Sequence, residues 1–483
     1  MARSFAVRGI VEGFYGTPWT HRARLDTIAF LAPHGMNAYA YAPKDDPRHR
    51  AAWREPYDAA ELGRFRELAG HADAHGVRFG FAISPGLDID YTDPTDRSAL
   101  LAKLAPLREA GVSWFLLLVD DIPPRPGLGP LQAGLGTWLR AELGDARLTV
   151  CPTEYVGTRP SPYLAELAGG LPADVDLMWT GPTVCSPTIT ADDARGWVDA
   201  VGGHGVVVWD NYPVNDAFMT RALHLGPYRG RDPHLADLVG GVLCNPMTQA
   251  YASHIALATA MAFLTDPDEY DPDAAWERAI AEIGGIRAPA LRALGRACAD
   301  GPVAPPEAIP LAGLVTRLRD ALAGDDWEEP LVAVDAELRA AAAAPGDLAA
   351  EPADDGDPEG GLATEVAPWA AAAAAEAAAG IAATKLIAMC GPPASPATTD
   401  PERALHRAIG VLARWQAIRA DEYTVFGPRF AVYTPIVQLP GGGPALDAAA
   451  AVREDANAID ALCRLALGVY DAWRGRGDTG AGA

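Results

Sequence analysis

The chain contains the stretch Leu116-Leu117-Leu118-Val119-Asp120-Asp121, in which four apolar residues are followed directly by two carboxylates. An apolar run that stops at charged residues predicts a β-strand buried on both faces, with the carboxylates at its end. Two ionised carboxylates in a partly desolvated pocket repel each other, which raises the pKa of one and leaves a proton available near neutral pH. Such a pair can divide the work of acid and base. The same residues also allow Asp121 to cap a turn before Pro123, with Asp120 as a solvated charge.

Short apolar runs alternate with longer amphipathic segments throughout the first half of the chain, which predicts parallel strands covered by helices. We expect the strands at Ala6–Val11, Ala38–Tyr41, Arg78–Ile83, Trp114–Val119, Leu148–Cys151, Asp176–Met178, Val206–Trp209 and Gly241–Leu243. Helical patterns with cap or turn signals lie between them, for example Pro18–Leu31, Asp58–His75, Asp96–Ala110, Thr190–Val201 and Asp216–Leu225. Eight such units predict a closed (β/α)8 TIM barrel in the α/β class.

The carboxyl ends of barrel strands carry the active site in folds of this kind. Polar, aromatic and glycine residues follow the expected strands: Glu12-Gly13-Phe14-Tyr15, Lys44-Asp45-Asp46, Ser84-Pro85-Gly86, Asp120-Asp121, Thr153-Glu154-Tyr155, Trp179-Thr180-Gly181, Asp210-Asn211 and Asn245-Pro246. The clustering favours a site at this rim, although ordinary loops also collect such residues.

From about Glu269 the pattern changes to helices rich in Ala, Leu, Arg and Glu. They are expected at Pro272–Ile283, Leu311–Ala323, Trp327–Ala344, Val366–Met389, Glu402–Glu422 and Ala445–Trp473. Because 483 residues exceed what one core usually supports, we expect two domains. These are a catalytic barrel over residues 1–268 and an α-helical bundle domain over residues 269–483. The acidic stretch rich in Pro, Gly and Ala near 345–361 suits a solvated loop. The segment Tyr423–Leu439 leaves the helical pattern, and either core packing, which we favour, or folding back on the barrel rim would explain it.

The charge balance argues against two classes of partner. A formal net charge of -24 would repel the phosphate backbone of nucleic acids and anionic membranes. We also expect no membrane-spanning segment, because the Ala-rich stretch Trp369–Ala379 is interrupted by Glu376 and lacks large side chains. A homo-oligomer is left open, since the helical half could pack on the barrel or on another subunit.

The six cysteines are widely spaced and lack the CxxC pairing of zinc sites. We interpret them as reduced thiols of a cytoplasmic protein, in keeping with an N-terminus that has no pattern of a secretory signal. No metal-binding motif accompanies Asp120 and Asp121, and the glycines near Glu12 fit neither a phosphate loop nor a dinucleotide fingerprint. We therefore expect neither a metal nor an organic cofactor.

Adjacent carboxylates cannot easily straddle a sugar ring as a separated acid and nucleophile would. For a glycosidase this favours a route in which the substrate supplies the nucleophile. The oxygen of a 2-acetamido group attacks the anomeric carbon, one aspartate holds the amide N–H, and the other protonates the departing oxygen.

The sequence of the expected barrel resembles glycoside hydrolase family 84, the O-GlcNAcase family. The motifs that carry the resemblance span the whole expected barrel in the family order. They are Val11-Glu-Gly-Phe-Tyr-Gly-Thr-Pro-Trp19, Tyr41-Ala-Pro-Lys-Asp-Asp46, Trp53-Arg-Glu55, Ile83-Ser-Pro-Gly-Leu-Asp-Ile89, Asp120-Asp-Ile122, Cys151-Pro-Thr-Glu-Tyr155, Trp179-Thr-Gly-Pro182, Trp209-Asp-Asn211 and Leu225-Gly-Pro-Tyr228.

The resemblance implies a role for each matched residue. Asp120 would orient the acetamido group, and Asp121 would be the general acid and then the base that activates water. Tyr155 would hydrogen-bond the acetamido oxygen or the oxazoline, and Asn211 would contact the reacting centre. Thr180, Val184 and Trp209 would line the N-acetyl pocket, while Gly13, Lys44, Asp216 and Asn245 would bind sugar hydroxyls.

Each of these residues also has a structural explanation. Trp209 could be a core aromatic, Asn211 and Asn245 turn formers, Thr180 and Val184 packing residues, and Tyr155 a rim aromatic. Lys44 could pair with Asp45 or Asp46 at the surface. One departure from the family concerns Ala217, which follows Asp216 where animal relatives have an aromatic residue, so the aglycone side of the cleft is expected to be more open.

The expected function is a retaining exo-β-N-acetylglucosaminidase that removes β-linked GlcNAc from proteins or small glycosides through an oxazoline intermediate. Two alternatives remain. One is the same chemistry on cell-wall, chitin or hyaluronan-type oligosaccharides, and the other is a GlcNAc-binding protein without catalysis.

Overall fold

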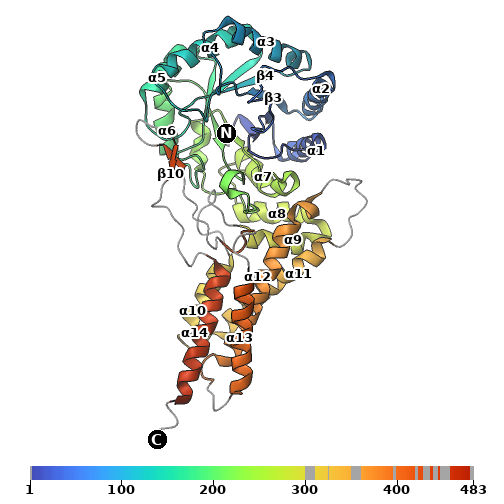
Figure 1. The fold of residues 1–483 in the computed structure, drawn as a ribbon, viewed down its shortest axis with the longest axis vertical. Helices are drawn as coiled ribbons and strands as arrows, with labels where there is room; N and C mark the ends of the chain where they lie inside the picture. The colour runs from blue at the N-terminus through green and yellow to red at the C-terminus, as the bar shows by residue number, and fades with distance from the viewer. Residues whose placement is uncertain are drawn as a thin grey trace.

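The computed structural model describes residues 3–299, 310–324, 326–349, 361–394, 399–418, 423–427, 436–438, 444–446 and 457–478. A barrel formed by the first half of the chain lies at one end of the molecule, and an elongated group of helices from the second half extends away from it (Figure 1).

Eight parallel strands close into a barrel in chain order, each hydrogen-bonded to the next and the last to the first. The strands are β1 (Val7–Glu12), β2 (Ala38–Tyr41), β3 (Arg78–Ile83), β4 (Trp114–Leu118), β5 (Arg147–Cys151), β6 (Asp176–Trp179), β7 (Val206–Asp210) and β8 (Gly241–Cys244). The predicted (β/α)8 fold is therefore confirmed, and every strand lies within one residue of the range expected from the sequence.

Nearly every strand residue is buried, because the barrel interior covers one face of the sheet and helices cover the other. Small side chains such as Ala38, Ala40 and Ala82 line the interior around Trp114. Gly80 is needed there, since a Cβ at this position would lie 2.6 Å from the Trp114 ring. The interior is thus a packed core, and free space is left at its two ends.

Helices cover the outside of the barrel, and most of them begin at polar caps that the sequence provides. They are α1 (His21–Leu31), α2 (Ala59–Ala74), α3 (Pro94–Glu109), α4 (Leu128–Glu142), α5 (Pro162–Gly170), α6 (Ala191–Ala200) and α7 (Ala250–Thr265). The side chains of Thr20, Asp58, Asp93, Ser161 and Thr190 accept hydrogen bonds from first-turn amides of five of these helices.

The helix expected over Asp216–Leu225 is wrong. This segment contains only a single 3-10 turn, η2 (Ala217–Met219), after which the chain is irregular. Ala217 has a left-handed backbone with φ 52°, which a helix does not tolerate. The polar side chains before it bond to other loops: Asn215 donates to the Gln249 side chain, and Asp216 accepts from the Tyr15 amide.

The second half of the chain is helical where it is described. Its elements are α8 (Pro272–Gly284), α9 (Ala288–Ala297), α10 (Pro310–Ala321), α11 (Glu328–Ala349), α12 (Leu362–Cys390), α13 (Pro401–Ala417), α14 (Ala458–Asp478) and a pair of short strands, β9 (Ile436–Gln438) and β10 (Pro444–Leu446). The expected boundary at residue 268/269 falls between α7 and α8, which pack on each other. The division at this position stays a prediction.

Three expected element ends need correction. The loop near 345–361 does not begin at Pro345, because α11 continues to Ala349 with Ala344 and Leu348 buried, so packing outweighs the helix-breaking effect of proline. Residues 350–360 of that loop lie outside the described residues. Helix α13 ends at Ala417, since Ile418 is extended.

The third correction concerns the expected helix Ala445–Trp473. Its first residues belong to β10, and the helix begins only after Asn457, whose side chain accepts from the amides of Ile459 and Asp460 and so caps α14.

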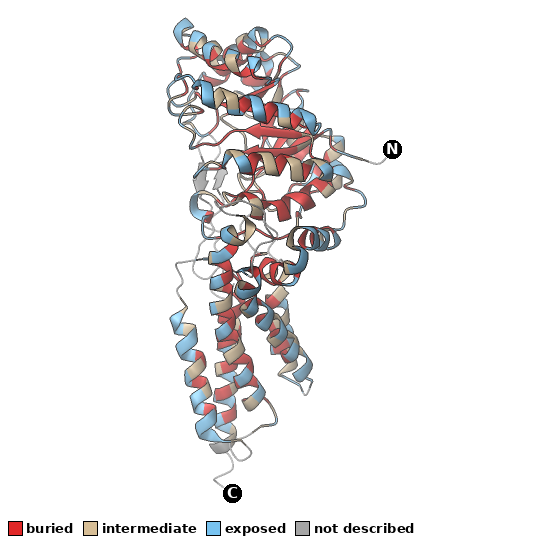
Figure 2. Cartoon of the chain, turned by 90° about the vertical axis from the view of Figure 1, so that its right-hand side faces the viewer, coloured by how far each residue is buried: buried red, intermediate tan, exposed pale blue. Residues whose placement is uncertain are grey.

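Helix α12 corrects one premise of the expectation on membranes, namely that no stretch is long and apolar enough to span a bilayer. By length and composition its 29 residues are apolar enough to do so. Over half of its most apolar window is buried inside the protein, as in the core helix of a soluble protein. Figure 2 shows this burial along the long helices. The Ala-rich stretch Trp369–Ala379 around Glu376 is only the middle part of this longer apolar helix.

The helical half is joined to the barrel by a shared core. Leu223, Met247 and Ile255 from the barrel pack in the same apolar cluster as α9, α11 and α12. Arg221, in the loop after β7, accepts backbone and side-chain hydrogen bonds through its carbonyl from Thr424 and Trp369. The described part of the segment Tyr423–Leu439 therefore meets the barrel loop at Thr424 and contributes the buried side chains of Val425 and Phe426 to the core.

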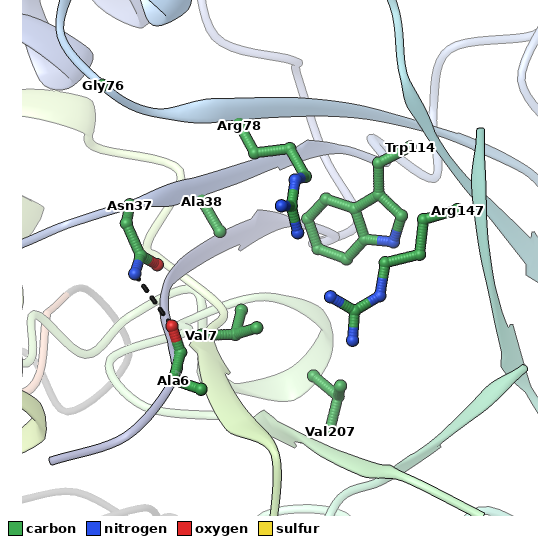
Figure 3. A pocket seen from close by; sticks show the side chains of 9 residues that line it. All are labelled: Ala6, Val7, Asn37, Ala38, Gly76, Arg78, Trp114, Arg147 and Val207. Carbon is green, nitrogen blue, oxygen red and sulfur yellow. Dashed lines mark hydrogen bonds between the residues drawn. The ribbon is translucent and has the colours of Figure 1, made fainter. Parts of the chain in front are cut away.

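A cavity of about 270 Å³ lies at the amino-terminal end of the strands (Figure 3). Trp114 and Val207 line it together with Arg78 and Arg147. Arg147 is already neutralised by Asp176, at 2.5 Å, and Arg78 is exposed. We interpret this end of the barrel as a solvated opening and place the chemistry at the opposite end.

Candidate active site

A cavity of about 200 Å³ opens at the carboxyl ends of the strands, and the structure brings all the predicted site residues to it. The cavity is lined by Gly13, Lys44, Asp120, Asp121, Tyr155, Thr180, Val184, Trp209, Asn211, Asp216 and Asn245, together with Tyr15, Cys151, Cys185, Val214, Ala217, Phe218 and Met219. These residues come from the ends of seven different strands or the loops that follow them, so only the closed barrel makes them neighbours.

Asp120 and Asp121 follow β4 after the single residue Val119, and both side chains line the cavity. Neighbouring residues of an extended strand point to opposite faces, so both can do this only where the extended conformation ends. Asp121 has a left-handed backbone with φ 52°, an uncommon and strained conformation for a residue with a side chain. The local strain is offset by the contacts that the Asp121 side chain makes.

Asp120 is the more buried of the two, with 7% of its side chain exposed. Its Oδ2 lies 2.5 Å from Lys44 Nζ, whereas its buried Oδ1 has no hydrogen-bond partner among the described residues. Burial raises the pKa of Asp120, and this outweighs the opposing effect of Lys44. An orphaned buried acceptor is costly and points to a donor that a bound molecule would bring.

Asp121 is more open and accepts two hydrogen bonds. Tyr15 Oη donates to its Oδ2 at 2.8 Å, and Tyr155 Oη donates to its Oδ1 at 2.9 Å. Burial acts to raise the pKa of Asp121, but Lys44, 3.7 Å away, and the two tyrosine hydroxyls outweigh it and lower the pKa. The surface-capping alternative for the pair does not fit this geometry.

Lys44 is buried, with 2% of its side chain exposed. Burial alone would lower its pKa, but Asp120 and Asp121 outweigh that effect and raise it, so the ammonium stays charged. The alternative pairing with Asp45 or Asp46 is not made: Asp45 accepts from the Gly16 amide, and Asp46 accepts from the hydroxyls of Tyr41 and Tyr57.

Trp209 forms one wall of the cavity and packs against the backbone of Gly13. A Cβ at Gly13 would lie 2.1 Å from Trp209 Cζ2, so glycine is required for this close approach. The indole donates to Asn211 Oδ1 at 3.1 Å, and Asn245 donates to the same oxygen at 2.9 Å. Asn211 in turn donates to the Val184 carbonyl at 2.7 Å. The two asparagines are therefore locked by side-chain bonds rather than serving as plain turn formers.

Asp216 lines the cavity from the loop after β7. Its Oδ2 accepts from the Tyr15 amide at 2.7 Å, and burial raises its pKa. Tyr15 therefore links Asp216 to Asp121 through its amide and its hydroxyl.

Tyr15 and Arg50 were not among the predicted site residues. Tyr15 belongs to the quoted motif after β1, and an aromatic hydroxyl at a strand end was the signal that could have marked it. Arg50 lies in a turn after β2 and carried no such signal, since its contact with Tyr15 depends on tertiary structure. Phe218, 45% exposed at the cavity, was likewise missed because the segment was expected to be helical.

Comparisons with known proteins show which family this chain resembles. A family model described as beta-N-acetylglucosaminidase matches residues 8–296, which covers the barrel and its catalytic rim. The Protein O-GlcNAcases of Rattus norvegicus and Mus musculus are each 35% identical to this chain over 267 residues. That match covers 52% of this chain and 29% of each relative, so the chain spans less than a third of the length of these relatives.

A solved structure extends the likeness into the helical half. A mutant of an O-GlcNAc hydrolase from Thermobaculum terrenum superposes with a TM-score of 0.79 and 27% sequence identity. The superposition covers 97% of this chain and 95% of the other.

Proposed function

The chain belongs to the beta-N-acetylglucosaminidase family, and from this premise we propose that it is a retaining, exo-acting β-N-acetylglucosaminidase that uses the 2-acetamido group of its substrate as the nucleophile. The observation that carries the proposal is the orphaned Oδ1 of Asp120 beside the more open carboxyl of Asp121. A buried acceptor without a donor suits an amide N–H, and an adjacent carboxyl suits proton transfer to an oxygen.

The proposed reaction has two steps. In the first, the acetamide N–H donates to Asp120 Oδ1 while the acetamide oxygen attacks the anomeric carbon, and Asp121 gives its proton to the departing aglycone oxygen. The product is an oxazoline that keeps its N–H proton, as an oxazolinium ion bonded to the ionised Asp120, with the configuration at the anomeric carbon inverted. In the second, Asp121 takes a proton from water, which attacks the anomeric carbon and reopens the ring. Two inversions give net retention, and Asp121 ends protonated as it began.

Protonation of the pair must change between the free site and the substrate complex. Burial raises the pKa of Asp120, whereas Lys44 and the tyrosine hydroxyls lower the pKa of Asp121, so a proton held by the free pair favours Asp120. An acetamide N–H that donates to Asp120 favours its ionised form, and the charge then raises the pKa of Asp121 by repulsion. A 2-acetamido substrate would thus place the proton on the residue that needs it, whereas a 2-amino sugar would not.

The remaining cavity residues fit supporting roles within the proposal. Thr180, Val184 and Trp209 would enclose the acetyl methyl group, and Tyr155 would donate to the acetamide oxygen. Gly13, Asp216 and Asn245 would bind the sugar hydroxyls, and Asn211 would contact the reacting centre. Lys44, buried against Asp120, would act mainly through its charge rather than as a hydroxyl ligand.

The aglycone belongs to the proposal as well. We propose β-linked GlcNAc on protein or on a small glycoside, with cell-wall, chitin or hyaluronan-type fragments as the competing substrates. Cys151, Cys185, Cys244, Cys298 and Cys390 form no disulfide, and four of these five are buried, which supports a reducing compartment such as the cytoplasm, where modified proteins are available.

The test is turnover of an aryl β-N-acetylglucosaminide by the purified chain, compared with the matching 2-amino glucosaminide. The proposal predicts turnover of the first, strongly reduced turnover of the second and inhibition by a thiazoline mimic of the oxazoline. Binding of GlcNAc without turnover of any of these glycosides would favour the non-catalytic alternative.

A further inference from the structure

A chain of contacts leads from the cavity to a residue outside it. Tyr15 donates to Asp121, and Arg50 donates through Nη1 to the Tyr15 hydroxyl. The Arg50 guanidinium also lies over the Tyr15 ring, 5.4 Å from its centre, and its Nη2 reaches the Asp121 carbonyl oxygen at 3.5 Å. Arg50 is not among the residues that line the cavity.

The turn that carries Arg50 is fixed to the barrel. The neighbouring His49 accepts the Ser84 amide through its carbonyl at 2.9 Å, and its ring bonds the Ala82 carbonyl at 2.8 Å. Arg50 Nε is buried and has no hydrogen-bond partner among the described residues. A buried donor without a partner lowers the stability of the fold. Packing alone therefore does not explain why an arginine is held at this position, in contact with Tyr15.

We propose that Arg50 is a positioning residue for the reaction, acting through Tyr15 to hold the Asp121 carboxyl in place for proton transfer. This inference rests on the proposed function for its catalytic readout. Tyr15 sits on an irregular loop after β1 and is 36% exposed, so its hydroxyl needs an anchor. The planar fork of arginine can bond the hydroxyl and stack on the ring together, which the single ammonium of a lysine cannot do.

Charge and position make different contributions at this site. Asp121 is faced by groups on several elements: Tyr15 after β1, Lys44 and Arg50 after β2, Asp120 beside it, Cys151 and Tyr155 at and after β5, and Asp216 after β7. The positive charge of Arg50 favours the ionised forms of both aspartates. The hydrogen bond from Tyr15 favours the ionised form of Asp121 alone. Burial raises the pKa of Tyr15 to about 12, so its hydroxyl remains a donor at neutral pH.

Arg50→Lys separates the effect of the charge from the effect of position, because lysine keeps the positive charge but lacks the planar guanidinium that bonds the Tyr15 hydroxyl and stacks on its ring. We expect kcat for an aryl β-N-acetylglucosaminide to fall about tenfold with KM nearly unchanged, the effect of losing one hydrogen bond to a charged group. Arg50→Gln should lower kcat similarly and also move both limbs of the pH profile to higher pH. In a Tyr15→Phe background, Arg50→Lys should have little further effect, since the two residues act as one unit.

Arg48→Lys and Arg48→Gln are matched controls. Arg48 lies two residues away on the same turn, pairs with Glu61 and stacks near Tyr57, so each of its replacements makes the same change of side chain without touching Tyr15. The inference is overturned if Arg50→Lys matches the wild type, if its effect adds in full to that of Tyr15→Phe, or if the Arg48 variants lose kcat equally.

A measurement that does not depend on turnover tests the role of Arg50 independently of the proposed function. Carboxyl ¹³C NMR of the free protein follows the titration of the aspartate pair. Arg50→Lys and Tyr15→Phe should raise the pKa of Asp121 to a similar extent, because each removes the anchored tyrosine bond, whereas Arg48→Lys should leave it unchanged. An inactive wild type with these shifts would refute the proposed function alone, and an active wild type without them would refute the role of Arg50.

Discussion

Lys44 Nζ lies 2.5 Å from Asp120 Oδ2 and 3.7 Å from Asp121 Oδ2, so one buried ammonium serves two adjacent carboxylates. This arrangement allows a pair of neighbouring aspartates to share one proton in a largely desolvated cavity. It also ties the activity of the site to a residue that need not touch the substrate.

The first prediction concerns Lys44→Met. Because the Lys44 charge lowers the pKa of both aspartates, its removal should raise both, and the two limbs of the kcat/KM profile against pH should move to higher pH. The profile is measured with an aryl β-N-acetylglucosaminide. Lys103→Met is the control, since Lys103 is also buried but donates to the Glu55 carbonyl and should leave the profile in place.

The same substitution should also change stability in a pH-dependent way. Removing one partner of a buried ion pair costs about 3–5 kcal/mol in the free energy of unfolding. In Lys44→Met the pKa of Asp120 would lie further above its unfolded value, so the deficit is largest at neutral pH and shrinks as pH falls through that raised pKa. Urea unfolding at pH 7 and pH 4.5 measures the difference. An equal loss of unfolding free energy at both pH values would contradict the assignment of Asp120 as the charge left without a partner.

A third prediction separates the roles of the two aspartates. Asp121→Ala removes the general acid, so it should slow glycosides with poor, alkyl-type leaving groups far more than activated aryl glycosides, which depart without a proton. Asp120→Asn removes the acceptor for the acetamide N–H and should slow both classes to a similar extent. Rates for paired substrates of each class decide the matter, and the opposite pattern would exchange the two roles.

The fourth prediction concerns the wall between Gly13 and Trp209. In Gly13→Ala the new methyl group would overlap the indole, whose Cζ2 lies 2.1 Å from the ideal Cβ position. The displaced indole would lose its bond to Asn211 and narrow the acetyl pocket, so kcat/KM and thiazoline affinity should both fall by about tenfold or more. Gly63→Ala, in α2 with open space around its Cβ position, should leave both unchanged and raise stability by about 0.5–1 kcal/mol.

Much of the barrel could be predicted because its strands are apolar runs that end at polar residues. The stretch from Leu116 to Asp121 shows both features in six residues, and the strand there ends within one residue of the expected position. The candidate site followed from the same logic, since residues at the ends of parallel strands must meet at one rim. The family resemblance added which of those residues to choose.

The remaining features depend on contacts that local pattern does not encode. Residues 216–225 have a helix-like composition, yet Asn215 donates to Gln249, Asp216 accepts from the Tyr15 amide, and Ala217 turns left-handed. Pro345 suggests a break, but the burial of Leu348 carries α11 past it. Arg50 acts through Tyr15 from another strand's loop, a relation that only the closed barrel creates.

The central claim is that the acetamido oxygen of the substrate is the nucleophile, held by Asp120. It is tested most directly by kcat/KM for aryl glucosaminides whose N-acyl group carries none, one, two or three fluorine atoms. Fluorine withdraws electron density from the acyl oxygen, so the account predicts a steep and regular fall in kcat/KM along the series, with the leaving group held constant. Rates that stay level across the series would contradict it and would assign the attack to an enzyme group or to water.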